Sequence, residues 1–131
     1  MAKAVGVGGV FFKARDPKAL TAWYAEHLGI PKADHGSLTF EGPESAGMTL
    51  FVPFAQDTKY FGDGPQQCMV NFRVDDLEGL LKKLEAAGVR IDPKREDYGY
   101  GPFAWIWDPE GNRIELWQPV ADSASGEDVP A

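Results

Sequence analysis

An internal repeat is the feature that most constrains what this chain can fold into. Residues 10–16 (VFFKARD) match residues 70–76 (VNFRVDD) at a shift of 60. In both segments apolar residues alternate along the chain, which is typical of a strand with two different faces. Both segments end at an aspartate, a residue that often caps a helix N-terminus. The sequence therefore predicts two copies of a strand followed by a helix.

The two helices have clear start and stop signals. Asp16 is followed by a proline at the first helical position, and Asp76 takes the same place in the second copy. The helices are predicted over residues 17–28 and 77–87, and the glycines that follow suit left-handed helix ends. The expected apolar stripes are Leu20, Trp23, Tyr24 and Leu28 in the first helix and Leu77, Leu80, Leu81 and Leu84 in the second.

Beyond the helices the repeat continues at a shift of 66. Residues 38–44 then match residues 104–110, and residues 49–53 match residues 115–119. Each copy reads as a strand, a helix and three short strands. We expect an α+β fold of two tandem βαβββ modules that form one cupped mixed sheet. The single domain, residues 1–131, divides into module one (about 8–53), a linker (54–67), module two (about 68–119) and a flexible tail (120–131).

Composition excludes several classes of partner. The 131 residues carry 13 basic and 20 acidic side chains, a net charge of −7, which disfavours nucleic acid. No segment has the length of a membrane span or the pattern of a signal peptide, so a cytoplasmic protein is expected. The lone cysteine, Cys68, cannot form an internal disulfide and is expected to be a small buried hydrophobe.

The two copies resemble the vicinal oxygen chelate superfamily, which includes glyoxalase I, bleomycin resistance proteins and extradiol dioxygenases. The first copy contributes VFFKARDP and AWYAEHLG, and the second NFRVDDL, AGV and DPEGNRIEL. The resemblance covers residues 8–119. It implies a sheet that curls around a small-molecule cleft, and it implies a homodimer because members commonly pair. The family spans lyases, dioxygenases and plain binders, so the reaction is not implied.

The resemblance also implies where a metal would bind. Metal-using members have a ligand on the first and the last strand of each copy, and the corresponding positions here are Gly9, Thr49, Met69 and Glu115. Only Glu115 could ligate a divalent ion. His27 is interpreted as a helix C-terminal residue and His35 as a solvated turn residue. We expect no metal and no other cofactor.

Strand alternation predicts which side chains face the cleft. Glu115 is the candidate catalytic residue, and the candidate ligand-binding residues are Phe11, Thr49, Phe51, Met69, Asn71, Arg73, Tyr98, Tyr100, Trp105, Arg113 and Trp117. This set forms an aromatic bowl with a few polar groups, which suits a small organic molecule.

Several features have two interpretations. Arg73 and Glu115 either hold a ligand, the arginine at an oxygen and the acid at a proton, or neutralise each other as a buried pair. The loop 98–101 (YGYG) either closes over the cleft or is an ordinary turn. The tryptophans line the cleft, pack within the sheet or form a dimer contact.

Three functions are compatible with these residues. The leading hypothesis is a metal-independent glyoxalase-like protein that binds a small organic ligand. The second is a lyase, isomerase or dioxygenase of the same superfamily that uses Glu115, with or without a divalent metal. The third is a structural or regulatory subunit whose cleft is filled by its own aromatic side chains.

Overall fold

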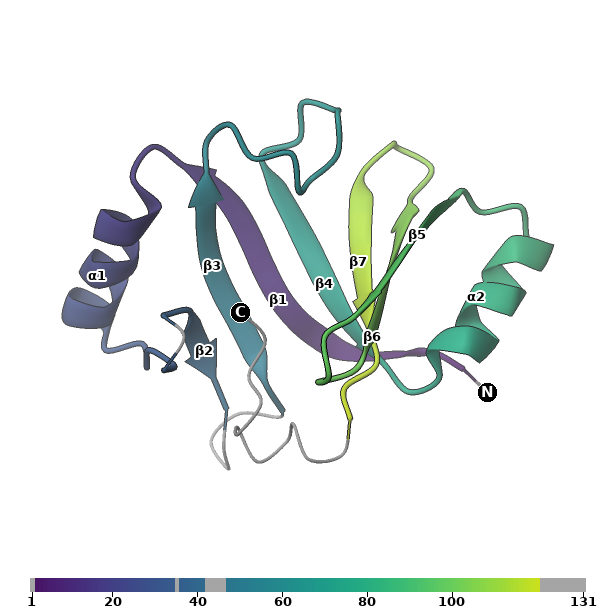
Figure 1. Cartoon of the computed structure of the whole chain (residues 1–131), viewed down its shortest axis with the longest axis horizontal. Helices are drawn as coiled ribbons and strands as arrows, with labels where there is room; N and C mark the ends of the chain where they lie inside the picture. The colour runs from purple at the N-terminus through teal and green to yellow at the C-terminus, as the bar shows by residue number, and fades with distance from the viewer. Residues whose placement is uncertain (1, 35, 42–46, 121–131) are drawn as a thin grey trace.

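The computed structural model describes residues 2–34, 36–41 and 47–120. They form one seven-stranded sheet in the order β2-β3-β1-β4-β7-β6-β5, with two helices (Figure 1). The strands are β1 (Ala4–Ala14), β2 (Leu38–Phe40), β3 (Thr49–Ala55), β4 (Cys68–Val74), β5 (Ile91–Asp97), β6 (Pro102–Trp107) and β7 (Arg113–Trp117). The helices are α1 (Pro17–Leu28) and α2 (Leu77–Ala86).

The predicted α+β fold of two βαβββ-like modules is confirmed. β1 and β4, the first strands of the two modules, pair antiparallel at the centre of the sheet. Each also pairs in parallel with the last strand of its own module, β1 with β3 and β4 with β7. Module one is the less regular copy, because the segment after its helix makes only an isolated bridge between Lys32 and Leu38.

Both helices begin and end close to the predicted residues. The Asp16 side chain accepts a hydrogen bond from the backbone N–H of Ala19, and Asp76 does the same for Gly79, each at 3.1 Å. These bonds satisfy N–H groups that have no partner within the helix. Gly29 follows α1 with φ +67°, a left-handed conformation that glycine adopts without strain.

The two faces of the sheet carry separate apolar clusters. We call the face that carries the larger cluster the hollow face and the opposite one the outer face. The hollow-face cluster is Phe11, Met48, Leu50, Phe61, Met69, Phe103, Trp105 and Trp117. The outer-face cluster packs α2 against the sheet through Val74, Leu77, Leu80, Leu81, Ala104 and Leu116. Most of the buried aromatic side chains therefore lie on the face that was predicted to hold the cleft.

The apolar stripe of α1 differs from that of α2. None of the residues of α1 is buried, and Trp23 and Leu28 remain 49% and 62% exposed. Leu20 and Tyr24 are half-buried, and the Tyr24 ring meets Phe51 of the sheet at 5.0 Å. α1 therefore lies against the sheet without the fully buried leucines that α2 has.

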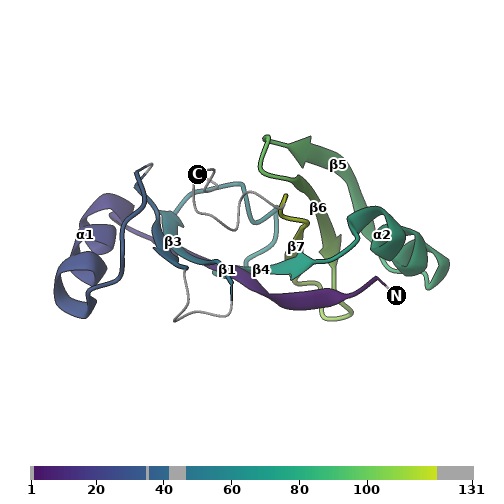
Figure 2. The same ribbon diagram turned by 90° about the horizontal axis from the view of Figure 1, so that it is seen from below.

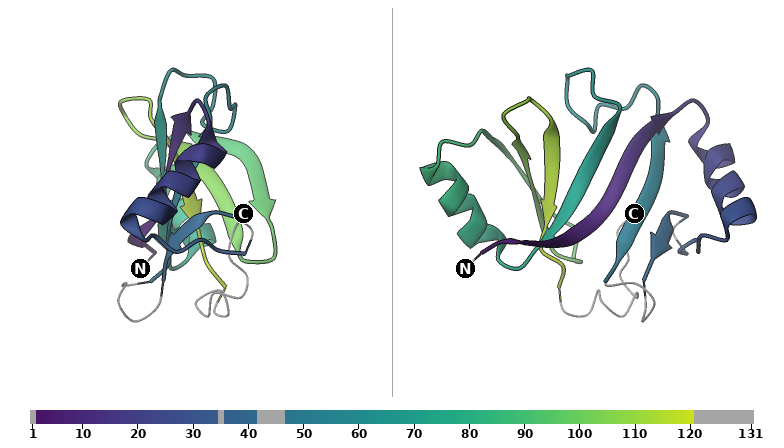
Figure 3. Two further views of the ribbon diagram at one scale, coloured as in Figure 1. Left: turned by 90° about the vertical axis from the view of Figure 1, so that its left-hand side faces the viewer. Right: turned by 180° about the vertical axis from the view of Figure 1, so that it is seen from behind.

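The helices lie at opposite ends of the sheet, and neither covers β1 and β4 from behind (Figure 3). Figure 2 shows β7, β6 and β5 rising in turn from the plane of the central strands, with α2 beside them. Val5 and Val7 of β1 are 53% and 41% exposed. Cys68, at the start of β4, is also exposed. The prediction of a buried Cys68 was wrong, because its strand end has no helix over it.

Two expectations fall outside the described residues. His35 is one, and the tail beyond Val120 is the other. In the part of the chain that the structure describes, neither helix is both long and apolar enough to cross a bilayer.

Candidate functional site

A partly enclosed cavity of about 360 Å³ lies on the hollow face. Strands of both modules and the loops beside them form its walls. The lining residues are Phe11, Ser37, Leu50, Val52, Phe54, Tyr60, Asn71, Tyr98, Tyr100, Phe103, Glu115 and Trp117. Seven of these twelve are aromatic, and the polar groups among them are few. The volume lies within the range of small-molecule pockets.

Glu115 is the central polar group of this cavity. It stands on β7, is 1% exposed and accepts hydrogen bonds from three side chains. Asn71 donates from Nδ2 at 2.6 Å, and Trp105 donates from the indole N–H at 3.0 Å. The Tyr60 hydroxyl donates to the same oxygen as Trp105. Three donors from β4, β6 and the β3–β4 loop thus fix the orientation of one buried carboxyl group.

Burial raises the pKa of Glu115 above its ordinary value, and the three hydrogen bonds and the Arg113 charge oppose that rise without cancelling it. The same burial, together with the neighbouring Glu115, raises the pKa of Tyr60. Glu115 therefore keeps its proton to a higher pH than a solvated glutamate, whereas Tyr60 stays a hydroxyl donor.

This shift predicts that stability depends on pH through Glu115. The unfolded chain loses the Glu115 proton near its ordinary pKa of 4.5, while the folded chain still holds it. The unfolding free energy of the wild type, minus that of Glu115→Gln, should therefore fall as pH rises above this value. The slope is at most about 1.4 kcal/mol per pH unit, and it vanishes above the folded-state pKa. Urea denaturation of both proteins across this range measures the difference, and a constant difference would contradict the shift.

Asn71 has room to reach Glu115 because a glycine of β1, Gly8, lies beside its side chain. A Cβ atom on Gly8 would lie 2.2 Å from the Asn71 Oδ1 atom, which is closer than real contacts allow. The Oδ1 atom itself has no hydrogen-bond partner among the described residues. The absence of a side chain at Gly8 thus leaves room for the Asn71 amide on the hollow face.

Six predicted site residues do line the cavity. They are Phe11, Asn71, Tyr98, Tyr100, Glu115 and Trp117. Met69 and Trp105 are buried in the surrounding hollow-face cluster. A ligand-binding role for these residues remains a prediction.

The predicted placement of Thr49 and Phe51 was wrong. Thr49 donates its hydroxyl to the Val7 carbonyl at 2.9 Å, and Phe51 packs against Tyr24 on the outer face. The cavity instead takes the alternate residues of β3, which are Leu50, Val52 and Phe54.

The strand register explains this error. Asn71 pairs with Glu115, and its repeat equivalent Phe11 pairs with Val52. The last strands therefore correspond at a shift of 63, not 66. An odd difference in register moves every side chain of a strand to its other face.

The two predicted arginines also lie outside the cavity lining. The Arg73 guanidinium donates to the Met48 carbonyl rather than to Glu115. Arg113 forms an ion pair with Asp92 at 2.6 Å and lines a different hollow. The predicted Arg73–Glu115 pair is therefore not formed.

Sequence reasoning missed Tyr60, which it assigned to a simple linker. Tyr60 stacks on Phe54 at 5.4 Å and bonds Glu115, while its neighbour Phe61 is 1% exposed. Two adjacent aromatic residues in the otherwise polar stretch 56–67 were the available signal, since such side chains rarely stay in solvent.

The residues present do not fit a divalent metal. With the register corrected, the four family positions hold Gly9, Val52, Met69 and Glu115. One of the four offers an oxygen donor, and that carboxyl already accepts three hydrogen bonds. Within the described residues, no three His, Cys, Asp or Glu side chains gather as a ligand set.

The 98–101 loop is tied to the end of β7. The Tyr100 carbonyl accepts hydrogen bonds from the Trp117 indole at 3.0 Å and from the Val120 N–H at 3.3 Å. Tyr98 is 47% exposed at the mouth of the cavity. The loop thus forms one wall, and its opening and closing remain a prediction.

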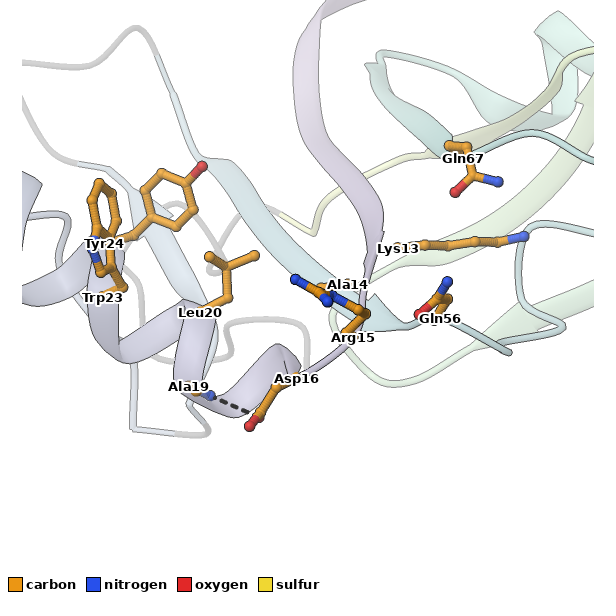
Figure 4. Close-up of a pocket in the computed structure, with 10 residues that line it drawn as sticks. All are labelled: Lys13, Ala14, Arg15, Asp16, Ala19, Leu20, Trp23, Tyr24, Gln56 and Gln67. Carbon is orange, nitrogen blue, oxygen red and sulfur yellow. Dashed lines mark hydrogen bonds between the residues drawn. The ribbon is translucent and has the colours of Figure 1, made fainter.

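A second, larger hollow of about 840 Å³ lies beside α1 (Figure 4). Its walls include Lys13, Arg15, Trp23 and Gln67, and it is open to the surface. Although it is larger, its described walls hold no buried, mutually bonded polar groups. The enclosed cavity around Glu115 is therefore the better candidate site.

A cupped sheet of two βαβββ-like modules, with a buried carboxyl in its hollow, defines a glyoxalase-like fold. The chain belongs to the Glyoxalase/Bleomycin resistance protein/Dioxygenase superfamily, whose sequence profile matches residues 10–116. No curated protein sequence matches the chain significantly.

Solved structures share this fold at low sequence identity. Methylmalonyl-CoA epimerase from Mycobacterium tuberculosis has a TM-score of 0.66 and 21% identity, over 93% of each chain. A variant of the Streptomyces coelicolor epimerase, in complex with 2-nitronate-propionyl-CoA, has a TM-score of 0.68 and 13% identity, over 91% of this chain and 100% of that one. A Legionella pneumophila protein described as NAD-dependent benzaldehyde dehydrogenase has a TM-score of 0.58 and 13% identity, over 86% and 98%. These likenesses show the fold alone.

Proposed function

We propose that this protein binds a small organic ligand, without a metal, in the cavity around Glu115. The observation that carries the proposal is a partly enclosed, mostly aromatic cavity of about 360 Å³ with one firmly oriented carboxyl group. Aromatic walls supply apolar contact area, and a single fixed polar group supplies orientation. The remaining volume counts against a cleft that is filled by the protein's own aromatic side chains.

Filling the cavity should weaken binding. We expect 2-naphthol, a neutral aromatic probe, to quench the fluorescence of the buried Trp117, which lines the cavity. Val52→Trp places a large side chain into the same space and should weaken this binding at least about tenfold. Ala86→Trp is the matched control, because Ala86 is exposed at the end of α2 and does not line the cavity. Equal binding by both variants, or no binding by the wild type, would contradict the proposal.

Native mass spectrometry of the untreated protein is the complementary experiment. It reports retained ligand, metal and subunit number together. A retained organic molecule of small mass supports the proposal, whereas a stoichiometric divalent metal contradicts it.

Pairing of two copies is part of the proposal, and the exposed Val5, Val7 and Trp23 are available apolar surface for it. A cytoplasmic location is likewise proposed, on composition alone.

An acid–base isomerase is the second candidate. The observation that favours it is the raised pKa of Glu115 beside the Tyr60 hydroxyl, since a buried carboxyl with a raised pKa is an effective general base. Glu115 would take a proton from carbon, and the Tyr60 hydroxyl would turn its single proton from Glu115 to the developing oxyanion. Deuterium uptake from D2O into the retained ligand, lost in Glu115→Gln, would favour this candidate over plain binding.

A further inference from the structure

The charge balance of the cavity points to a class of ligand. Glu115 is the one acidic side chain among the described lining residues, and none of those residues is a lysine, arginine or histidine. The nearest arginine on the same strand, Arg113, is held by Asp92 at 2.6 Å. An anionic group in the cavity would therefore meet a carboxyl and no opposite charge, which strongly disfavours it.

Aromatic rings make up much of the cavity wall. Phe54 and Tyr60 of module one and its following loop form a stacked pair at 5.4 Å, with 12° between the ring planes. Phe103 and Trp117 of module two form another at 5.7 Å and 7°. The faces of aromatic rings carry partial negative charge and attract cations, most strongly where water is excluded.

Glu115 completes this arrangement. Its carboxyl lies among the rings, buried and oriented by Asn71, Trp105 and Tyr60. Rings that surround a buried acid form a box that suits an ammonium group, because the acid supplies the opposite charge and the rings replace water. The net charge of −7 favours the approach of a cation from solution.

We propose that the cavity binds an organic cation, an amine or quaternary ammonium group on a small apolar body, with Glu115 as its counter-ion. This inference rests on the proposed function and narrows its ligand class. Neutral aromatic molecules also fit the walls, but they leave the buried acid with no positive charge nearer than Arg113, which is already paired with Asp92.

Binding of a cation is coupled to the ionisation of Glu115. The groups around this carboxyl that titrate or carry charge are Tyr60, Tyr98, Tyr100, Arg113 and Lys94, the last lying over the Trp105 ring. Burial raises the pKa values of Tyr60 and Tyr98, so neither becomes an anion at moderate pH. Glu115 is thus the group whose charge changes, and the cation should bind more tightly as pH rises.

Three probes of similar shape test the proposal by fluorescence titration. Benzyltrimethylammonium is a cation, neopentylbenzene is its neutral isostere and phenylacetate is an anion. At about pH 8 we expect the cation to bind at least about tenfold more tightly than the neutral isostere, and the anion to bind least. Between about pH 5 and pH 8 the affinity for the cation should rise, by up to about tenfold per pH unit while Glu115 is protonated in the free protein.

Glu115→Gln keeps the shape and removes the charge. It should erase both the preference for the cation and the pH dependence. Glu110→Gln is the matched control, because it removes the same charge from an exposed turn before β7 and should change neither. Should Glu115→Gln fail to fold, Tyr60→Phe is the second variant. Loss of its hydrogen bond should move the pH midpoint of cation binding upward.

The outcomes separate the two proposals. If the neutral isostere binds as tightly as the cation, or if Glu115→Gln keeps the preference, the cation proposal is wrong and the binding function stands. If none of the three probes nor 2-naphthol binds, both are wrong.

Discussion

Trp117→Ala is expected to lower the free energy of unfolding by about 3–5 kcal/mol. Trp117 is 0% exposed at the end of β7. Its ring stacks on Phe103 at 5.7 Å, and its indole N–H donates to the Tyr100 carbonyl at 3.0 Å. Alanine would remove the ring from the hollow-face cluster and leave the Tyr100 carbonyl with one donor fewer.

Trp107→Ala is the matched control for this substitution. Trp107 lies at the end of β6, is only partly buried and has the Arg90 guanidinium over its ring at 3.8 Å. Its loss should cost roughly 1–2 kcal/mol, because less apolar surface is buried there. Urea denaturation followed by far-UV circular dichroism measures both variants. Equal losses would mean that the hollow-face cluster contributes no more to stability than the sheet margin does.

Gly101→Ala is expected to cost about 3 kcal/mol or more, since two effects combine at one residue. Gly101 has φ +123°, a conformation that other residues rarely adopt. A Cβ atom there would also lie 2.0 Å from the backbone oxygen of Gln118. The backbone near Gln118 is not free to yield, because its N–H donates to the Pro102 carbonyl at 3.2 Å.

Gly99→Ala separates the two effects. Gly99 lies in the same loop with φ +92°, but a Cβ atom there would meet nothing within 4 Å. Its substitution should cost only the backbone strain, about 1–2 kcal/mol. The excess loss in Gly101→Ala therefore measures the steric contact. Similar values for the two glycines would show that the loop and the end of β7 move apart easily, which would support a mobile lid over the cavity.

Much of the fold was predictable because it depends on local chemistry. The aspartate caps, the proline at residue 17 and the glycines after the helices act on their immediate neighbours, so the sequence specifies where each helix begins and ends. The alternation in β4 also placed its two faces correctly, with Met69 and Asn71 on the hollow face and Val74 under α2. Successive side chains of a strand point to opposite faces, and this alternation does not depend on which strand it pairs with.

The candidate site was predictable only in part, because it depends on pairing between distant segments. The face that β3 presents is set by its register with β1, and a similar motif at the wrong shift put Thr49 and Phe51 in the cavity. The partners of the arginines were equally hidden, since Asp92 precedes Arg113 by 21 residues and the Met48 carbonyl that Arg73 reaches is 25 residues from it. Nothing near either arginine in sequence identifies these partners.

The sequence by itself determined that two related modules would form one cupped sheet and that Glu115 would be the acidic residue in its cleft. The tertiary structure decided what surrounds that acid. Tyr60, from a segment between the modules, and Asn71 and Trp105, from two other strands, meet at Glu115. The reason is physical: capping and alternation are satisfied within a few residues, whereas a buried carboxyl is satisfied by whichever donors the folded chain brings within reach.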